Sequence, residues 1–309
     1  MITSLRLLAA FSFWLLSSLL HLKFSLFLVQ PLATFWGTIK LKNYAPYFAY
    51  LLIFLLLIFL LWLFFKASTK PAFQRIIIYL WIFLLAIISL INLYLLATPL
   101  ENIHFVQYAI IAILFIWAIR PAYNNDFNSE LAIIAKTLFW VTLAGIVDEF
   151  MQYLWITASY SKHLDFNDFL LNLMGTIAGL LSYYSFKLIS YAESPVFSPD
   201  KKYSGYFSPI IWSFWEVRFS IILVSIFISF FYFDYMQLTT NELIKEGGIG
   251  IFNQHLSLFF ERSPKLLGSW NNAFNGGRYY ILSPLEGSLI LLLVAFGFYW
   301  GIIKAITKL

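Results

Sequence analysis

The sequence of 309 residues contains no cysteine, which excludes disulfide bonds, thiolate metal sites and cysteine nucleophiles. It also has little charge, since only 11% of its residues are Asp, Glu, Lys or Arg, against about a quarter in soluble domains. Hydrophobic residues make up 61% of the chain and aromatic residues 21%. This composition argues against a water-soluble fold and indicates a chain embedded in a lipid bilayer.

Long apolar runs fill most of the chain, and a membrane-spanning helix needs about 20 mostly apolar residues. The sequence therefore predicts an all-α, polytopic bundle of about eight transmembrane helices. We read the first run as an uncleaved helix, because it continues past the length of a signal peptide. The predicted spans are residues 5–28, 46–65, 74–97, 103–119, 131–157, 166–190, 213–233 and 287–307.

The basic residues predict how these spans are oriented. If the N-terminus lies in the cytoplasm, twelve Lys and Arg residues fall on the cytoplasmic side and only four in the short outer connectors. The positive-inside rule therefore places both termini in the cytoplasm. The net charge of +5 is scattered between apolar runs and forms no basic stripe, so nucleic acid is not an expected partner.

Two of the predicted helices lie in residues 1–74, four in 75–190 and two in 191–309. The last region includes a long outer connector, at about residues 235–286. Within it, Ile249–Phe260 is predicted to be an interfacial amphipathic helix. Asn271–Tyr280 is predicted to be a turn between short extended pieces, because it contains Gly276–Gly277. The connector carries no expected chemistry.

Ionisable side chains inside or at the edge of spans are costly, and here they cluster on three successive spans. At the start of the fourth span, Glu101, His104 and Tyr108 share one helical face. Asp148, Glu149 and Gln152 lie near the end of the fifth. In the predicted orientation all three clusters lie toward the outer face, so we expect them to converge into one site.

The sixth span opens with a stripe of small and polar residues on one helical face. The connector before it contains Lys162 and His163. The stripe ends in a GxxxG pattern that allows close helix packing. Its members are Asp165, Asp168, Asn172, Gly175 and Gly179.

The combination of these motifs over about residues 75–190 resembles the VanZ-like membrane proteins. The matching elements are Glu101, His104–Phe105 and Tyr108; Asp148–Glu149 and Gln152; and Asp168, Asn172, Gly175 and Gly179. Members of that family often carry an Arg in the turn between the Gln and the Asp. Here Lys162 supplies positive charge instead, without the bidentate fork of Arg.

The resemblance implies a multi-pass protein of the bacterial cytoplasmic membrane with a role in the cell envelope, including glycopeptide (teicoplanin) resistance. It implies no particular reaction.

Two hypotheses of function follow from the residues. In the first, a non-catalytic or transport-like envelope protein binds or handles a lipid-linked or amphiphilic ligand at an outer-leaflet polar site. In the second, it is a membrane enzyme acting on a lipid or polyprenyl phosphate, with Glu149, His104 and Asp148 as candidate catalytic residues. Glu101-x-x-His104 and the nearby carboxylates would suit Mg²⁺ or Mn²⁺.

A purely structural explanation competes for some of these residues. Glu101, Asp165 and Asp168 lie in first turns, where acids favour the helix dipole. Asn172 can hydrogen-bond between helices, and Gly175 and Gly179 serve packing. Asp148 and Glu149 lie deeper in their span, so the structural explanation is weakest for them.

Overall fold

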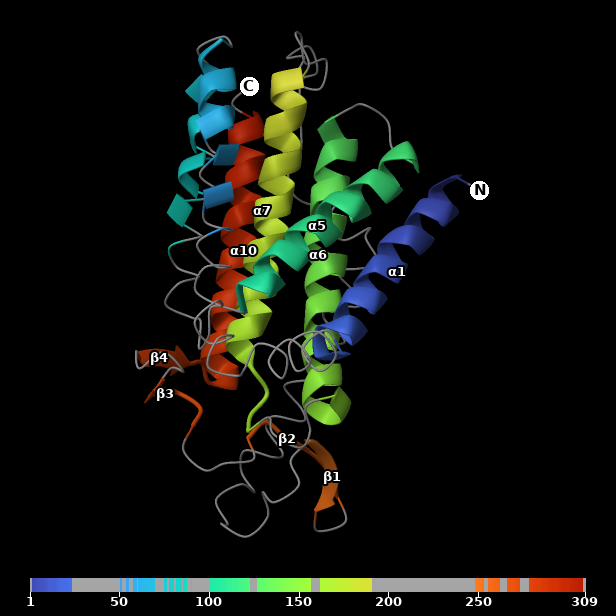
Figure 1. Ribbon diagram of the computed structural model, residues 1–309, viewed down its shortest axis with the longest axis vertical. Coiled ribbons are helices and arrows are strands. Elements are labelled where there is room, and N and C mark those ends of the chain that lie inside the picture. Colours follow the sequence, from blue (N-terminus) through green and yellow to red (C-terminus); the bar gives the residue numbers. More distant parts are fainter. Residues whose placement is uncertain are drawn as a thin grey trace, which may run out of the picture.

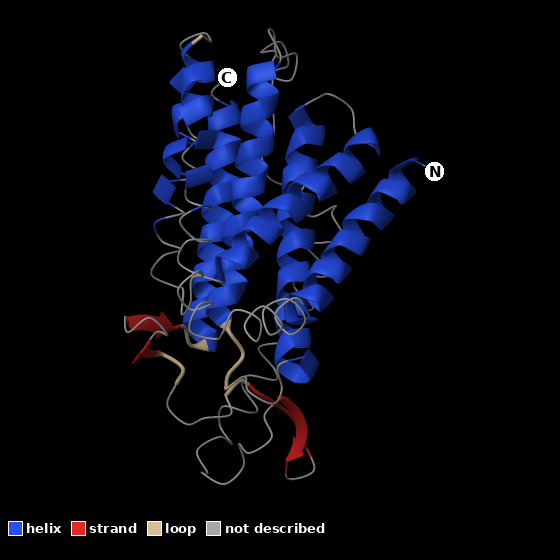
Figure 2. Cartoon of the chain, viewed as in Figure 1, coloured by secondary structure: helices blue, strands red, loops and turns tan. Residues whose placement is uncertain are grey.

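The computed structural model describes residues 2–23, 101–122, 127–156, 162–190, 248–252, 255–261, 266–272 and 278–307, together with positions between 51 and 90. Helices dominate this part of the chain (Figure 2). The long helices are α1 (Ile2–Lys23), α5 (Asn102–Ile119), α6 (Phe127–Met151), α7 (Phe166–Ser190) and α10 (Pro284–Thr307). A 3-10 turn η3 (Arg120–Ala122) follows α5, and a π-helix η4 (Gln152–Ile156) continues α6.

α7 is the central helix of the bundle. It packs against α5, α6 and α10, and α1 lies alongside α5 (Figure 1). The close approach of α7 to α5 depends on two glycines. A Cβ at Gly175 would lie 2.4 Å from the carbonyl oxygen of Phe105, and one at Gly179 would lie 2.4 Å from that of Ala109. Side chains at these positions would therefore force the two helices apart.

Two stretches of the described chain are long and apolar enough to cross a membrane, namely Ile103–Ala122 and Phe166–Lys187. Shorter apolar stretches lie in α1 and α10, at Ser4–Leu19 and Pro284–Tyr299. Large apolar side chains on the outer surface of the bundle, such as Leu293 at 69% exposure, suit contact with lipid better than with water.

Most predicted spans correspond to helices where the structure describes them. Residues 5–28, 103–119, 166–190 and 287–307 overlap α1, α5, α7 and α10, and residues 131–157 overlap α6 with η4. The described positions within 46–65 and 74–97 are helical. The predicted span 213–233 lies outside the described residues. A mostly helical fold is therefore confirmed.

The predicted amphipathic helix at Ile249–Phe260 is wrong. This segment forms an antiparallel pair of strands, β1 (Gly248–Phe252) and β2 (His255–Phe259), with Phe252 opposite His255. Each glycine, at 248 and 250, costs a helix about 1 kcal/mol relative to alanine, and the β-branched Ile249 and Ile251 favour a strand. These local preferences outweigh the helical apolar pattern.

The prediction of extended pieces on either side of Gly276–Gly277 is confirmed. β3 (Ser269–Asn272) and β4 (Arg278–Ile281) pair antiparallel, with Trp270 opposite Tyr280. Both hairpins lie at one end of the bundle. α1 begins and α10 ends toward the other end (Figure 1).

Candidate functional site

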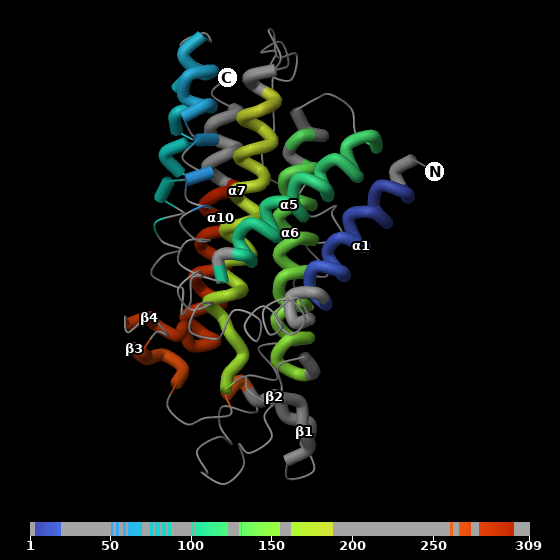
Figure 3. The backbone as a smooth tube through the Cα atoms, in the orientation of Figure 1, coloured from blue at the N-terminus to red at the C-terminus, as the bar shows by residue number. Residues whose placement is uncertain are grey.

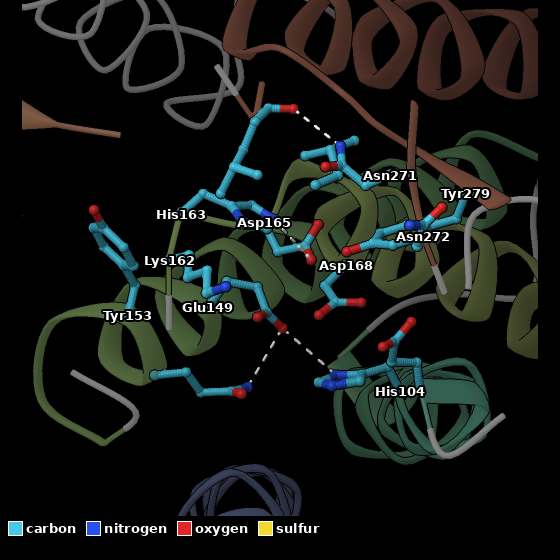
Figure 4. A pocket seen from close by; sticks show the side chains of 14 residues that line it. His104, Glu149, Tyr153, Lys162, His163, Asp165, Asp168, Asn271, Asn272 and Tyr279 are labelled. Atoms are coloured by element: carbon cyan, nitrogen blue, oxygen red, sulfur yellow. Dashed lines mark hydrogen bonds and ion pairs between the residues drawn. The ribbon is translucent and has the colours of Figure 1, made fainter. Parts of the chain in front are cut away.

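A cavity of about 590 Å³ opens at the hairpin end of the bundle, where α5 begins, α6 ends and α7 begins (Figure 4). The structure therefore brings together the three polar clusters that the sequence places on successive spans. The helices and the connector before α7 supply Glu101, His104, Glu149, Gln152, Tyr153, Lys162, His163, Asp165 and Asp168. The hairpin of β3 and β4, with the residue Leu266 before it, contributes the remaining lining residues: Leu266, Asn271, Asn272, Tyr279 and Ile281.

Three side chains in this cavity have the arrangement of metal ligands. His104 of α5, Glu149 of α6 and Asp168 of α7 each offer one ligand atom, and these atoms all lie within 4.8 Å of one another. His104 and Glu149 are 2% and 4% exposed, and His104 Nδ1 lies 3.5 Å from Glu149 Oε1. Ligands about 2.1 Å from one Mg²⁺ ion lie roughly 3–4 Å apart, so small side-chain movements would complete such a site.

Glu149 is oriented by two amide side chains. Asn172 Nδ2 donates a hydrogen bond to Glu149 Oε1 at 3.1 Å, and Gln152 Nε2 donates to the same oxygen at 3.4 Å. Asn172 is buried one helical turn beyond Asp168 on α7. The buried Oδ1 atom of Asp168 accepts no hydrogen bond from the part of the chain that the structure describes. The carboxylates are therefore held in place but incompletely satisfied.

The charges of the cavity are unbalanced. Glu101, Glu149, Asp165 and Asp168 contribute four carboxylates, whereas Lys162 is the one lysine among the described lining residues, with two histidines beside it. Neighbouring carboxylates repel one another unless a cation lies between them. The site can therefore hold a divalent cation, which would in turn bind and polarise a phosphate oxygen.

Tyr108 and Asp148 meet behind the cavity and do not line it. The Tyr108 hydroxyl donates to Asp148 Oδ2 at 2.9 Å, and both side chains are fully buried. Nearby, Gln107 Nε2 donates to Ser17 Oγ at 3.0 Å and so ties α5 to α1. Asn172, Gly175 and Gly179 also lie outside the lining: Asn172 holds Glu149, and the glycines pack α7 on α5.

Asp165 marks the rim of the cavity, just before α7. Burial raises its pKa, but the His163 imidazole, 3.5 Å away, and the backbone N–H groups of Asn167 and Asp168 outweigh that effect and hold the pKa below the usual value. Asp165 therefore stays ionised. Residues 162–165 lead into α7 at the hairpin end of the bundle (Figure 3), where Leu164 N donates to Phe260 O at 2.8 Å.

The hairpin residues of the site were missed by sequence reasoning, which assigned the connector no chemistry. Asn271, Asn272 and Tyr279 line the cavity. Burial, and then the charges of Asp165, Glu101 and Asp168, raise the pKa of Tyr279 to about 12, so its phenol remains a hydrogen-bond donor. In the sequence, these hairpin residues are marked only by a pair of asparagines beside a predicted turn. Such a pair does not indicate where the hairpin packs.

A second polar cluster, also missed, joins the same three helices at their other end. We call it the Glu130 clamp; it consists of Arg120, Glu130, Tyr184 and Lys187. The carboxylate of Glu130 on α6 is 1% exposed and accepts from Lys187 Nζ at 2.9 Å and from the Tyr184 hydroxyl at 2.8 Å. Arg120 forms a further ion pair with it. In this cluster one carboxylate faces two cations, and it borders no described cavity.

No family model, curated protein or solved structure matches this chain. The resemblance to VanZ-like proteins therefore rests on the sequence motifs alone.

Proposed function

We propose that the protein is a membrane protein whose cavity binds the phosphate-bearing head group of an amphiphile through a divalent cation. The observation that carries this proposal is the meeting of His104, Glu149 and Asp168, with ligand atoms within 4.8 Å of one another on the wall of the cavity. Mg²⁺ and Mn²⁺ suit this oxygen-rich set of ligands.

A bound cation would offset the negative charge of the cavity and so allow an anionic head group to bind there. Four carboxylates would repel a phosphate, so an anionic head group needs a cation between it and the protein. Three protein ligands leave coordination positions open for phosphate oxygens. Lys162, exposed at the cavity, adds a further positive charge.

In the proposed topology the chain crosses the membrane about eight times and has both termini in the cytoplasm. The cavity then faces the outer leaflet of the bacterial cytoplasmic membrane. The start of α1 and the end of α10 both lie toward the end of the bundle opposite the hairpins, which supports this arrangement (Figure 1). An outer-leaflet site agrees with a VanZ-like role in handling a lipid-linked envelope precursor, including a role in glycopeptide resistance.

An enzymatic version of the same proposal follows from the open coordination positions of the cation. His104, Glu149 and Asp168 would hold the cation, and the cation would supply a bound water acidic enough to act as a nucleophile beside the phosphate ester. Attack of that water on phosphorus would release the lipid alcohol and inorganic phosphate. Release of inorganic phosphate from a lipid phosphate monoester would identify the enzyme, and retention of the intact lipid would identify the binding protein.

The test is a titration of the purified protein in detergent with Mn²⁺, in which electron paramagnetic resonance measures the free and bound ion. We expect His104→Ala, Glu149→Gln and Asp168→Asn each to weaken Mn²⁺ binding by more than about 100-fold, since loss of supporting residues alone costs about 10–100-fold. Glu101→Gln is the matched control, because it removes a carboxylate from the same cavity but outside the triad.

The head group is tested with phosphatidic acid. Retention of this lipid by the wild type in Mn²⁺, with loss on chelation, supports the proposal. Triad variants that bind Mn²⁺ as tightly as the wild type would overturn it.

A further inference from the structure

The cavity has two unlike walls. The helices contribute a charged wall that contains the triad of His104, Glu149 and Asp168. The hairpin of β3 and β4 contributes a neutral polar wall, formed by Asn271, Asn272 and Tyr279 (Figure 4). A ligand that fills the cavity therefore meets a cation site on one side and uncharged hydrogen-bonding groups on the other.

The hairpin is held rigidly against the start of α7. The side chain of Asn167 donates to Tyr280 O at 2.6 Å and accepts from Leu282 N at 3.0 Å. The Tyr280 hydroxyl donates to Glu286 Oε1 at 2.9 Å, which fixes the hairpin to α10. Ile281 and Leu282 are buried in the bundle. The backbone of the hairpin is thus fixed before a ligand arrives, which lowers the entropic cost of binding.

Asn271 uses its amide within the protein, where Nδ2 donates to Leu266 O and Ser269 O, but the other two members of this wall have unused hydrogen-bonding capacity. Within the described residues, neither the Asn272 side chain nor the Tyr279 hydroxyl has a hydrogen-bond partner. An amide offers two donor hydrogens and an acceptor oxygen, and a phenol offers one donor hydrogen. Such uncharged groups match hydroxyls, which both donate and accept, better than they match a second charge or an apolar chain.

The volume of the cavity also favours a ligand with a hydroxyl-bearing group beyond its phosphate. Its volume of about 590 Å³ is in the range of cavities that enclose whole small molecules of about 300–1,000 Å³. A cation and a single phosphate would leave most of it unfilled. The remaining space lies against the hairpin, so the group beyond the phosphate is the one that Asn272 and Tyr279 contact.

We infer that the head group is a neutral polyhydroxyl ring, a sugar or a cyclitol, esterified to the phosphate, and that Asn272 and Tyr279 select it. This inference rests on the proposed function, because the cation is what places the phosphate. It assigns the β3–β4 hairpin the role of specificity element and leaves the cation site to the helices.

The experiment compares two phosphodiester lipids with equal charge and equal acyl chains, phosphatidylinositol and phosphatidylmethanol, in nanodiscs that contain the protein and Mn²⁺. We expect the wild type to bind phosphatidylinositol about tenfold more tightly, because only this lipid offers ring hydroxyls to the hairpin. Asn272→Ala and Tyr279→Phe should reduce this preference severalfold and leave Mn²⁺ binding unchanged. Free inositol 1-phosphate, added as a competitor, distinguishes a soluble ligand from a lipid head group.

Tyr299→Phe on α10 is the matched control, since Tyr299 does not line the cavity and this change leaves the Tyr280 anchor of the hairpin intact. Retained Mn²⁺ binding shows that each variant is folded. Equal affinity of the wild type for the two lipids would overturn the inference and leave the proposed function standing. Failure to bind either lipid in Mn²⁺ would overturn the proposed function as well.

Discussion

The two ends of the bundle use the same three helices to opposite effect. At the end away from the hairpins, Glu130 of α6 pairs with Arg120 and with Lys187 of α7, and the Tyr184 hydroxyl completes its hydrogen bonds. At the hairpin end, four carboxylates line an open cavity with a single lysine among the described lining residues. Both ends bury charge, but only the Glu130 clamp neutralises it within the protein.

The two ends differ in how many cations and hydrogen-bond donors surround each carboxylate. A buried carboxylate that has ion pairs and hydrogen bonds stabilises a fold, or at least costs it little, and has no capacity left for a ligand. A group of carboxylates with few cations costs stability until a ligand supplies the missing charge. The clamp is therefore a structural contact between helices, whereas the cavity keeps a negative charge that a bound cation would offset. Each prediction below tests this contrast.

The largest expected effect is on the clamp. Glu130→Gln leaves Arg120 and Lys187 close together without a counter-charge, which should lower the free energy of unfolding by about 3 kcal/mol. Denaturant-induced unfolding in mixed micelles, followed by tryptophan fluorescence, measures the loss. Glu149→Gln in metal-free protein should cause no loss, since it removes one of several repelling carboxylates. Equal destabilisation by both substitutions would contradict the contrast between the two ends.

The next effect concerns the glycine packing that brings α7 and α5 together. A Cβ at Gly175 would lie 2.4 Å from Phe105 O, so Gly175→Ala should cost about 1–3 kcal/mol of stability. Because Phe105 follows His104, the shift should also weaken Mn²⁺ binding, which titration measures. Gly297→Ala on α10 is the control, since no atom of the described residues lies within 4 Å of the added Cβ. If Gly175→Ala retains normal Mn²⁺ affinity, close packing does not set the geometry of the triad.

A smaller effect is expected from the amide that orients Glu149. Asn172→Ala removes the 3.1 Å hydrogen bond to Glu149 Oε1 and should weaken Mn²⁺ binding about tenfold, as loss of a supporting residue does. Isothermal titration calorimetry gives the affinity. Thr176→Val, one turn further along α7, serves as the control, because among the described residues the Thr176 hydroxyl bonds within its own helix, to Asn172 O. An equal loss in both variants would assign the effect to packing.

The smallest effect is the pH dependence of the rim. The pKa of Asp165 is lowered in the folded protein, so its stabilisation is present above the unfolded value of about 3.9 and disappears as the pH falls through the folded pKa. We therefore expect the wild type to exceed Asp165→Asn in melting temperature at pH 6, and the gap to close below about pH 4. Thermal melts of both proteins from pH 6 to pH 3 measure it; a gap that stays constant would show that ionisation of Asp165 contributes nothing.

The sequence determined the parts of this protein that depend on local patterns. Long apolar runs gave the helices, because a backbone in lipid must satisfy its own hydrogen bonds. The spacing of Glu101 and His104, and of Asp168 and Asn172, placed each group on one helical face. The alternation of spans then placed Glu149 at the same end as His104 and Asp168. That reasoning located the charged wall of the cavity by residue number.

Only the tertiary structure decided the rest, because it depends on contacts between segments far apart in the chain. Asn167 binds Tyr280 O and Leu282 N across more than a hundred residues, and no local pattern predicts that the hairpin completes the cavity. The Tyr108 hydroxyl donates to Asp148 Oδ2 behind the site, across forty residues. Glu130 was not singled out from the sequence, because its partners Arg120 and Lys187 belong to other segments of the chain. Which carboxylates are neutralised within the fold, and which still need a cation, is decided by those distant partners.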